Sequence, residues 1–323
     1  MEYSADLFKP IHESERVSSG IVRPSVSYWQ DAWRRFRRHK PALIAAAILL
    51  LIILGAIIIP YVYPYTYDQQ VRTARNLWPN LQHPFGTDKL GRDLFIRTVY
   101  GARISLSIGI VASIINLTLG VIYGGISGYV GGKLDNIMMR FVDILYSIPL
   151  ILYVILLKVV FQDAIKEAFE TTALRSLKYL GPELILIYVV LGSVYWVGMA
   201  RMVRGQILSI KNNEYVLAAR SMGASGGRII LRHLVPNTVG QIIVTVTMSI
   251  PSAIFTESFL SFIGIGVSAP MASWGSLASD AYKGLASYPY LLFFPALAIS
   301  VTVLAFNIMG DGLRDALDPR MRK

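Results

Sequence analysis

The sequence predicts an all-α membrane protein with six transmembrane helices. Three observations lead to this fold class: only 16% of the 323 residues are charged, the mean hydropathy is +0.51, and the apolar residues stand in long blocks. A soluble domain carries about a quarter charged residues. The block at residues 42–59 has no charged residue. Its length approaches the ~20 residues that a helix needs to cross a hydrocarbon core of about 30 Å.

Six apolar segments are predicted to span the membrane. They lie at residues 42–62, 104–130, 138–160, 183–202, 237–256 and 290–309. We expect the first to be a retained span and not a signal peptide. It begins beyond residue 40, and the tyrosine-rich run that starts at Tyr61 follows it in place of a small-residue cleavage site. Those tyrosines are expected at the membrane interface.

Basic residues set the expected orientation. The run Trp33–Lys40, directly before the first span, holds four arginines and one lysine, and such residues are retained on the cytoplasmic side. We therefore expect cytoplasmic tails at 1–41 and 310–323, an extracytoplasmic segment at 63–103, and a five-helix core at 104–309. The same bias explains the net charge of +11 without nucleic acid as a partner.

Two outer segments have further predicted structure. Residues 163–180 place apolar groups at helical spacing, which predicts an amphipathic helix at the outer interface. The outer segment 257–289 is neither polar enough for a simple loop nor apolar enough for a span, and it contains the run Leu260–Gly266. This run is predicted to be a partly inserted, re-entrant piece, which needs protein or a water-filled cavity beside it.

Few charged residues fall within the predicted spans. Arg140 and Asp143 are three positions apart and are expected to pair on one helix face. Lys158 is expected to extend toward the outer surface, and Glu257 stands at the outer end of the fifth span. No acidic residue lies at the middle of the later spans, so we expect no proton or sodium relay and an energy source outside this chain.

Three glycines repeat at every fourth position in the second span. Gly120, Gly124 and Gly128 share one helix face, and residues without side chains let a second helix approach closely. Tight packing, within the bundle or against a partner subunit, is favoured over a direct role in binding substrate.

Motifs for catalysis or cofactors are missing from the sequence. There is no cysteine, the four histidines have no metal-ligand spacing, and no glycine-rich phosphate loop of the P-loop type occurs. We expect no enzyme activity, no metal and no bound cofactor in this chain. His233 is expected to serve at a surface and not as a catalytic base.

The segment at 213–237 is too long and too patterned for a simple connection between spans. Good helix formers extend from Glu214 to Arg220, Gly223 is expected to end that helix, and a second helix is expected to start at Arg228. Such a short helix clamped between two spans can transmit the motion of a bound protein to the bundle. A solvated basic loop is the alternative.

The same segment resembles the signature of membrane subunits of binding-protein-dependent ABC importers. That pattern is roughly E-A-A, three residues, G, nine residues, I-x-L-P. Ala218, Ala219 and Gly223 match it, Leu217 stands at the position of the glutamate, and the ending Leu234–Pro236 is looser. Further runs resemble the C-type permease subunit of dipeptide and oligopeptide importers over about residues 30–320: His83–Asp93, Gly101–Leu106, Ser273–Ser276 and Asn307–Arg320.

The resemblance implies a type I ABC importer permease fold in a bacterial cell membrane. It implies a second homologous permease subunit, two cytoplasmic ATPase subunits that bind the ATP, an extracytoplasmic substrate-binding protein, a peptide substrate and surrounding membrane lipid. Residues 213–227 would form the coupling helix that contacts an ATPase. The implied contact residues are Glu214, Tyr215, Ala218, Ala219, Arg220, Gly223, Ala224 and Ser225. Importers of nickel, glutathione or another small solute belong to the same family and remain alternatives.

Two other classes of function remain open from the residues alone. A self-contained channel or ion-coupled carrier is one, although the lack of acids at mid-membrane disfavours it. A membrane scaffold whose 213–227 segment binds a protein other than an ATPase is the second.

Overall fold

The computed structural model describes residues 27–171, 181–267 and 271–318. The described residues form helices and connecting segments without a strand, apart from an isolated bridge between Thr87 and Asp93. The helices are α1 (Tyr28–Arg38), α2 (Lys40–Val62), the short η2 (Arg72–Ala74), α3 (Leu94–Val130), α4 (Gly132–Ser147), α5 (Leu150–Thr171), α6 (Pro182–Ile210), α7 (Glu214–Ser221), α8 (Gly226–Ile229), the π-helical η4 (Ile230–Leu234), α9 (Val235–Phe262), α10 (Trp274–Tyr282) and α11 (Tyr290–Leu317).

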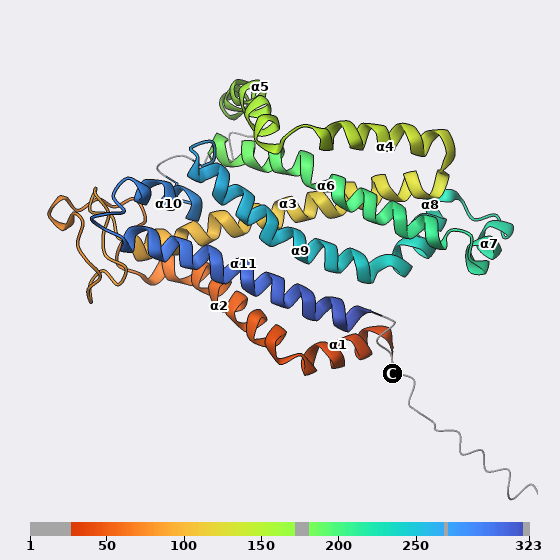
Figure 1. Ribbon diagram of the computed structural model, residues 1–323, viewed down its shortest axis with the longest axis horizontal. Helices are drawn as coiled ribbons and strands as arrows, with labels where there is room; N and C mark the ends of the chain where they lie inside the picture. Colours follow the sequence, from red (N-terminus) through yellow and green to blue (C-terminus); the bar gives the residue numbers. More distant parts are fainter. Residues whose placement is uncertain (1–26, 172–180, 268–270, 319–323) are drawn as a thin grey trace, which may run out of the picture.

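Long apolar helices run along the length of the molecule (Figure 1). Among the described residues, five helical segments have the length and hydropathy of a membrane span: α2, α3, α6, the continuous run from α8 through α9, and α11. This confirms the prediction of an all-α, multi-span protein. The helices extend past the predicted spans, and α3 begins at Leu94, ahead of the predicted start at 104.

The third predicted span is a bent pair of helices. α4 and α5 have the character of a span only together, and they meet at an angle of 93°. Ile148, between them, is extended with ψ 124°, because the ring of Pro149 disfavours a helical conformation in the residue before it. The predicted third span at 138–160 is thus a bent pair of helices, and it makes a sixth span if the pair is counted as one.

The predicted interfacial helix at 163–180 is not a separate element in its described part. Residues 163–171 continue α5 without a break, and residues 172–180 lie outside the described residues. The apolar spacing that predicted a helix was correct, but its start was placed too late.

The segment after the fifth span returns to the bundle as a short helix. α9 continues to Phe262, and the predicted re-entrant run ends in a turn in which Ile265 N and Gly266 N both donate to Leu260 O. Gly264 holds φ +84° there, a conformation that suits glycine. α10 follows and packs against α3, α9 and α11. Residues 268–270, within this connection, lie outside the described residues.

A buried carboxylate joins α3, α9 and α10. Ser105 Oγ donates to Glu257 Oε2 at 2.9 Å, and Ser261 Oγ donates to Glu257 Oε1 at 2.7 Å. The backbone N–H of Trp274 donates to Ser105 Oγ at 3.3 Å, and its indole N–H donates to Thr98 O at 2.9 Å. Glu257 thus lies at the predicted outer end of the span, where its hydrogen bonds hold α10 in place.

Local capping explains where several helices begin. Ser27 and Gln30 form a capping box at α1, and Ser273 with Ser276 forms another at α10. At α3 the Asp93 carboxylate accepts from Ile96 N at 3.0 Å. Each cap satisfies backbone N–H groups that the first helical turn leaves without a partner.

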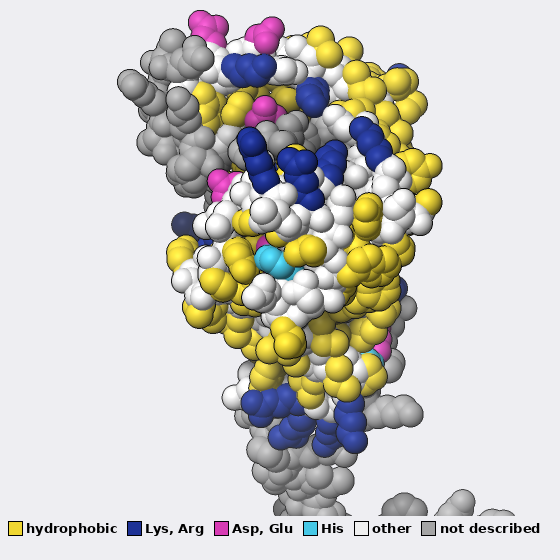
Figure 2. Space-filling model, turned by 90° about the vertical axis from the view of Figure 1, so that its left-hand side faces the viewer, with side chains coloured by type: hydrophobic (Ala, Val, Ile, Leu, Met, Phe, Trp, Pro, Cys, Tyr) yellow, Lys and Arg dark blue, Asp and Glu magenta, His cyan; other side chains and the backbone are white. Residues whose placement is uncertain are grey.

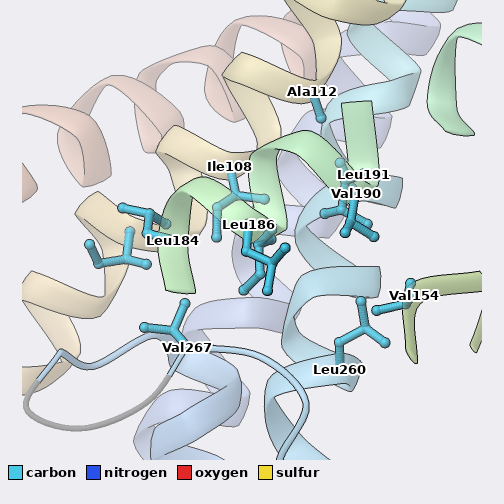
Figure 3. Close-up of a cluster of buried hydrophobic side chains, with 12 residues drawn as sticks. Ile108, Ala112, Val154, Leu184, Leu186, Val190, Leu191, Leu260 and Val267 are labelled. Atoms are coloured by element: carbon cyan, nitrogen blue, oxygen red, sulfur yellow. The ribbon is translucent and has the colours of Figure 1, made fainter. Parts of the chain in front are cut away.

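The repeated glycines pack α3 tightly on α6. A Cβ atom at Gly120, Gly124 or Gly128 would come closer than 3.0 Å to Met199, the backbone of Ala200, or the carbonyl of Arg204, respectively. The structure therefore places this glycine face within the chain's own bundle. Side chains of α3, α5, α6 and α9 also form a buried apolar cluster that includes Ile108, Val154, Leu191 and Leu260 (Figure 3).

Two predictions for charged side chains need correction. Asp143 pairs with Arg201 of α6 at 2.7 Å and not with Arg140, because the α4 face that carries Asp143 turns toward α6. Lys158 Nζ donates to Ile265 O at 3.0 Å, so its side chain ties α5 to the turn after α9. Both contacts join segments far apart in the sequence.

Candidate docking site

The segment from α7 to η4 lies at one end of the molecule, together with α1 and the end of α11 (Figure 1). The opposite end holds α10 and the segment at 63–93. The predicted coupling segment and the two described chain ends therefore lie at the same end of the molecule, as the prediction of six spans requires. Gly223 separates α7 from the turn that leads into α8, as the sequence predicted.

Two small apolar side chains anchor α7 to the bundle. Val216 is fully buried and Ala219 is 2% exposed. They are three positions apart and so lie on one helix face. Both belong to a core cluster with Val203 and Ile207 of α6 and with Leu234 of η4. This packing is essential, because an isolated helix of eight residues is unstable in water.

The other face of α7 presents apolar side chains to the outside. Tyr215, Leu217 and Ala218 are exposed, and Met222, directly after the helix, is 82% exposed. Leu231 adds a further exposed apolar side chain on η4. Several exposed apolar side chains on neighbouring segments point to a binding site for another molecule.

Hydrogen bonds of the Schellman type close the end of α7. Gly223 N donates to Arg220 O at 3.0 Å, and Ala224 N donates to Ala219 O at 3.0 Å. Gly223 has φ +79°, while a Cβ atom built on it would meet no atom within 4 Å. The glycine is therefore required for its backbone conformation and not for space.

A short turn at residues 222–225 joins α7 to the helical run that leads into α9. Ser225 precedes α8 in an extended conformation, and its carbonyl accepts from Ile229 N at 3.0 Å. α8, the π-helical turn and α9 then follow each other directly. A displacement of α7 therefore reaches α9 through the short turn at 222–225 and then through continuous helix from α8 onward.

The end of α3 lies beneath this segment. The Arg220 guanidinium stands 5.8 Å from the centre of the Tyr129 ring, a cation–π distance. A Cβ atom on Gly226 would lie 3.0 Å from the same ring. α7 and α8 therefore both contact Tyr129.

An ion pair fixes the ends of α3, α4 and α6 next to Tyr129. Arg204 donates to the Asp135 carboxylate through Nε at 2.5 Å and Nη2 at 2.6 Å, a bidentate arrangement. Ser127 Oγ donates to the same carboxylate at 2.5 Å, and Lys211 Nζ donates to Gly128 O at 3.0 Å. α7 thus projects from a rigid base.

The predicted contact residues fall into two groups. The structure leaves Glu214, Tyr215, Ala218, Arg220, Gly223 and Ser225 exposed and Ala224 half-buried. Ala219 faces the bundle, so it anchors α7 and is not part of the exposed surface. Partial burial raises the pKa of the Tyr215 hydroxyl, and its hydrogen bond to Asn213 opposes that shift.

Leu217, Met222 and Leu231 are surface residues that the sequence prediction did not include. The burial of Val216 and Ala219 fixes which side of α7 turns outward, and the sequence carried no signal for it because both faces carry apolar residues. No group of three or more His, Cys, Asp or Glu residues within the described ranges is arranged to hold a metal.

Comparison with known protein families identifies the chain. The family described as binding-protein-dependent transport system inner membrane component matches residues 88–323. The chain belongs to this family. The N-terminal transmembrane domain of oligopeptide transport permease C matches residues 27–79 of the permease.

Curated relatives cover nearly the whole permease. It is 49% identical over 312 residues to the dipeptide transport system permease protein DppC of Bacillus subtilis, covering 96% of this chain and 92% of the relative. It is 46% identical over 318 residues to the oligopeptide transport system permease protein OppC of the same organism, with 98% of each chain covered. The glutathione transport system permease protein GsiD of Escherichia coli is 39% identical over 295 residues, covering 91% of each chain.

Proposed function

We propose that this permease imports dipeptides or oligopeptides across a bacterial cell membrane. The observation that carries the proposal is near full-length identity of 46–49% to permease proteins named for dipeptide and oligopeptide transport. In this proposal both termini and α7 lie in the cytoplasm. The basic side chains of α1, directly before the first span, support that orientation.

The proposed assembly contains four further proteins. A second homologous permease supplies the other half of the translocation path, two cytoplasmic ATPases bind and hydrolyse ATP, and an extracytoplasmic binding protein delivers the peptide. This chain supplies no ATPase site and needs no cofactor of its own. Family membership supports this composition, because the family is defined by transport that depends on a binding protein.

The exposed face of α7 is the proposed contact with one ATPase. Tyr215, Leu217, Ala218 and Met222 offer the apolar part of the contact, and Glu214 and Arg220 stand exposed within the same helix. The anchored side of α7 and its short connection to the helical run of α8 through α9 support a coupling role. Closure of the ATPase dimer would move α7, and α9 would move with it.

Reconstitution in liposomes tests the proposed function. The permease with its co-purifying partners should take up a labelled dipeptide only when ATP and the binding protein are both present. The isolated chain should neither hydrolyse ATP nor transport. Uptake by this chain alone would instead identify a self-contained carrier, and co-purification without any ATPase would identify a scaffold.

Glutathione is a second candidate substrate. The identity of 39% to a glutathione permease favours it, although that identity is lower than the identity to the peptide permeases. Competition between labelled dipeptide and unlabelled glutathione in the same liposomes separates the two. Peptide uptake that persists at a large excess of glutathione favours the peptide.

A further inference from the structure

A cavity of about 190 Å³ lies at the end of the molecule opposite α7, between the segment at 76–97 and α10 with its following turn. Asp88, Arg92 and Arg97 line one side, and Asp280 and Lys283 line the other. Figure 2 faces this end of the molecule, where a group of lysine and arginine side chains stands on the surface.

The run His83–Asp93 builds one wall of the cavity as a rigid loop. The Asp88 carboxylate accepts from Leu90 N at 2.8 Å, Arg92 N at 3.0 Å and Arg92 Nε at 2.6 Å. Tyr290 Oη, at the start of α11, donates to Thr87 O at 2.9 Å and ties the loop to the opposite wall. The cavity is therefore preformed.

Arg97 is buried in this wall with an incomplete set of partners. Its side chain is 3% exposed. Its Nη1 donates to the backbone oxygen of Tyr67 at 3.3 Å, whereas its Nε has no hydrogen-bond partner among the described residues. The nearest carboxylate oxygens, of Asp88 and Asp280, are 3.9 Å away, beyond hydrogen-bond distance. A buried guanidinium group left in this way has lost hydration without full compensation. A planar carboxylate is the group that its forked N–H donors fit.

The charge around the cavity also favours an anion. The lining holds four cationic side chains, Lys89, Arg92, Arg97 and Lys283, and two carboxylates, Asp88 and Asp280. The Asp88 carboxylate already accepts hydrogen bonds from Arg92. The Asp280 side chain is 55% exposed, and its carboxylate oxygen lies 3.7 Å from Arg92 and 3.9 Å from Arg97. Asp280 is thus a weakly held internal carboxylate that an incoming one can replace.

The cavity ends blindly in packed apolar side chains. Leu94, Ala281 and Leu291 line it and belong to a buried cluster, and Leu277 is also buried. These buried side chains close the inner side of the cavity, so the cavity suits a group that enters from outside. Its volume corresponds to roughly six water molecules at about 30 Å³ each, which is room for one acidic side chain.

We propose that this cavity binds a carboxylate and receives an acidic side chain of the extracytoplasmic binding protein when that protein docks. This inference rests on the proposed function. A protein side chain is favoured over the carboxyl terminus of a transported peptide, because the site is blind and lies at the outer end of the bundle. Asp280 holds the site until the partner's carboxylate arrives.

Docking of the purified binding protein to the complete transporter in nanodiscs tests the proposal. Lys283→Glu reverses a charge of the cavity and is expected to weaken docking about tenfold, whereas Asp280→Asn removes the competing carboxylate and tightens docking about threefold. Arg97→Lys keeps the positive charge but removes the planar pair of guanidinium N–H donors, so it is expected to weaken docking. Arg72→Glu, exposed on the same outer segment but outside the cavity, is the matched control and weakens docking no more than about twofold.

Basal ATP hydrolysis and co-purification of the ATPases separate this inference from the proposed function. If the ATPases fail to assemble with the wild-type chain, the proposed function itself is wrong. If the complex assembles normally but Asp280→Asn fails to tighten docking, or Lys283→Glu matches the control, the cavity is not a docking site. Altered binding of a labelled dipeptide, with docking unchanged, assigns the cavity to substrate and overturns the proposal. The thermal unfolding temperature of each variant complex shows that it has folded.

Discussion

Replacing Gly223 with alanine is expected to loosen the end of α7 without creating a steric clash. Gly223 has φ +79°, and a Cβ atom there would meet nothing within 4 Å. The left-handed conformation costs a residue with a side chain about 1–2 kcal/mol. Alanine also makes the unfolded chain less flexible than glycine does, and this stabilises the folded state by about 0.4–1 kcal/mol. The substitution therefore destabilises the end of α7 by about 1 kcal/mol. This raises the equilibrium constant for local opening of that end about fivefold.

Hydrogen exchange of the transporter in nanodiscs measures this change directly. The amides of Gly223 and Ala224 donate the hydrogen bonds that close α7, so they should exchange about fivefold faster in Gly223→Ala. Gly223→Asn should change exchange less than twofold, because asparagine tolerates this conformation. Asn76 of the same chain already adopts φ 51°.

Gly227→Ala is the matched control for this prediction. Gly227 also has open space around a built Cβ atom, but its φ is not positive. Its substitution should leave exchange at the end of α7 unchanged. Equal exchange in Gly223→Ala and wild type would refute the argument that backbone conformation requires glycine. Among these variants, the amount of peptide taken up per ATP hydrolysed should fall most in the variant whose amides at the end of α7 lose most protection from hydrogen exchange.

Four further substitutions test the packing around the site, and a quenching experiment tests the place of α1. Asp135→Asn and Arg204→Gln should each cost about 2 kcal/mol of stability, because either leaves a partly buried polar group without its partner. In thermal unfolding, the double variant should lose at least about 1 kcal/mol less than the sum of the two, and strict additivity would contradict the pairing. Gly124→Ala should cost about 1–3 kcal/mol, since its Cβ meets the α6 backbone; Gly198→Ala, with open space, should not be destabilising. Trp33, exposed on α1, should be quenched by brominated lipid in a single-tryptophan variant, and quenching by aqueous iodide alone would place α1 away from the membrane.

The long spans could be predicted from the sequence because lipid imposes a simple requirement on composition. A helix that faces hydrocarbon must be apolar over its whole crossing length, and α2 and α11 satisfy this in uninterrupted blocks. The bend between α4 and α5 escaped the same reasoning because both sides of Pro149 are apolar. Hydropathy does not register a change of direction.

The orientation of α7 was harder to predict, because apolar residues occupy both of its faces. Val216 and Ala219 face the bundle while Leu217 and Met222 face outward, and hydropathy does not distinguish the two pairs. The end of α7 at Gly223 was predictable, because glycine at this position has a conformational cause.

Contacts between distant segments could not be read from the sequence. Asp143 finds Arg201 58 positions away, while the nearer Arg140 had looked like the natural partner. The cavity at the outer end likewise depends on Asp280 approaching Arg92 and Arg97 from a different part of the chain.

Cross-linking from single cysteines tests most directly the claim that the exposed face of α7 docks an ATPase. The chain contains no cysteine, so Met222→Cys introduces one reactive site at a residue that is 82% exposed. It should cross-link to an ATPase subunit in the assembled transporter. Ala219→Cys, buried against the bundle, and Leu81→Cys, fully exposed at the opposite end, should not. A cross-link to the ATPase from Leu81→Cys, or none from Met222→Cys in an assembly that hydrolyses ATP, would contradict the account.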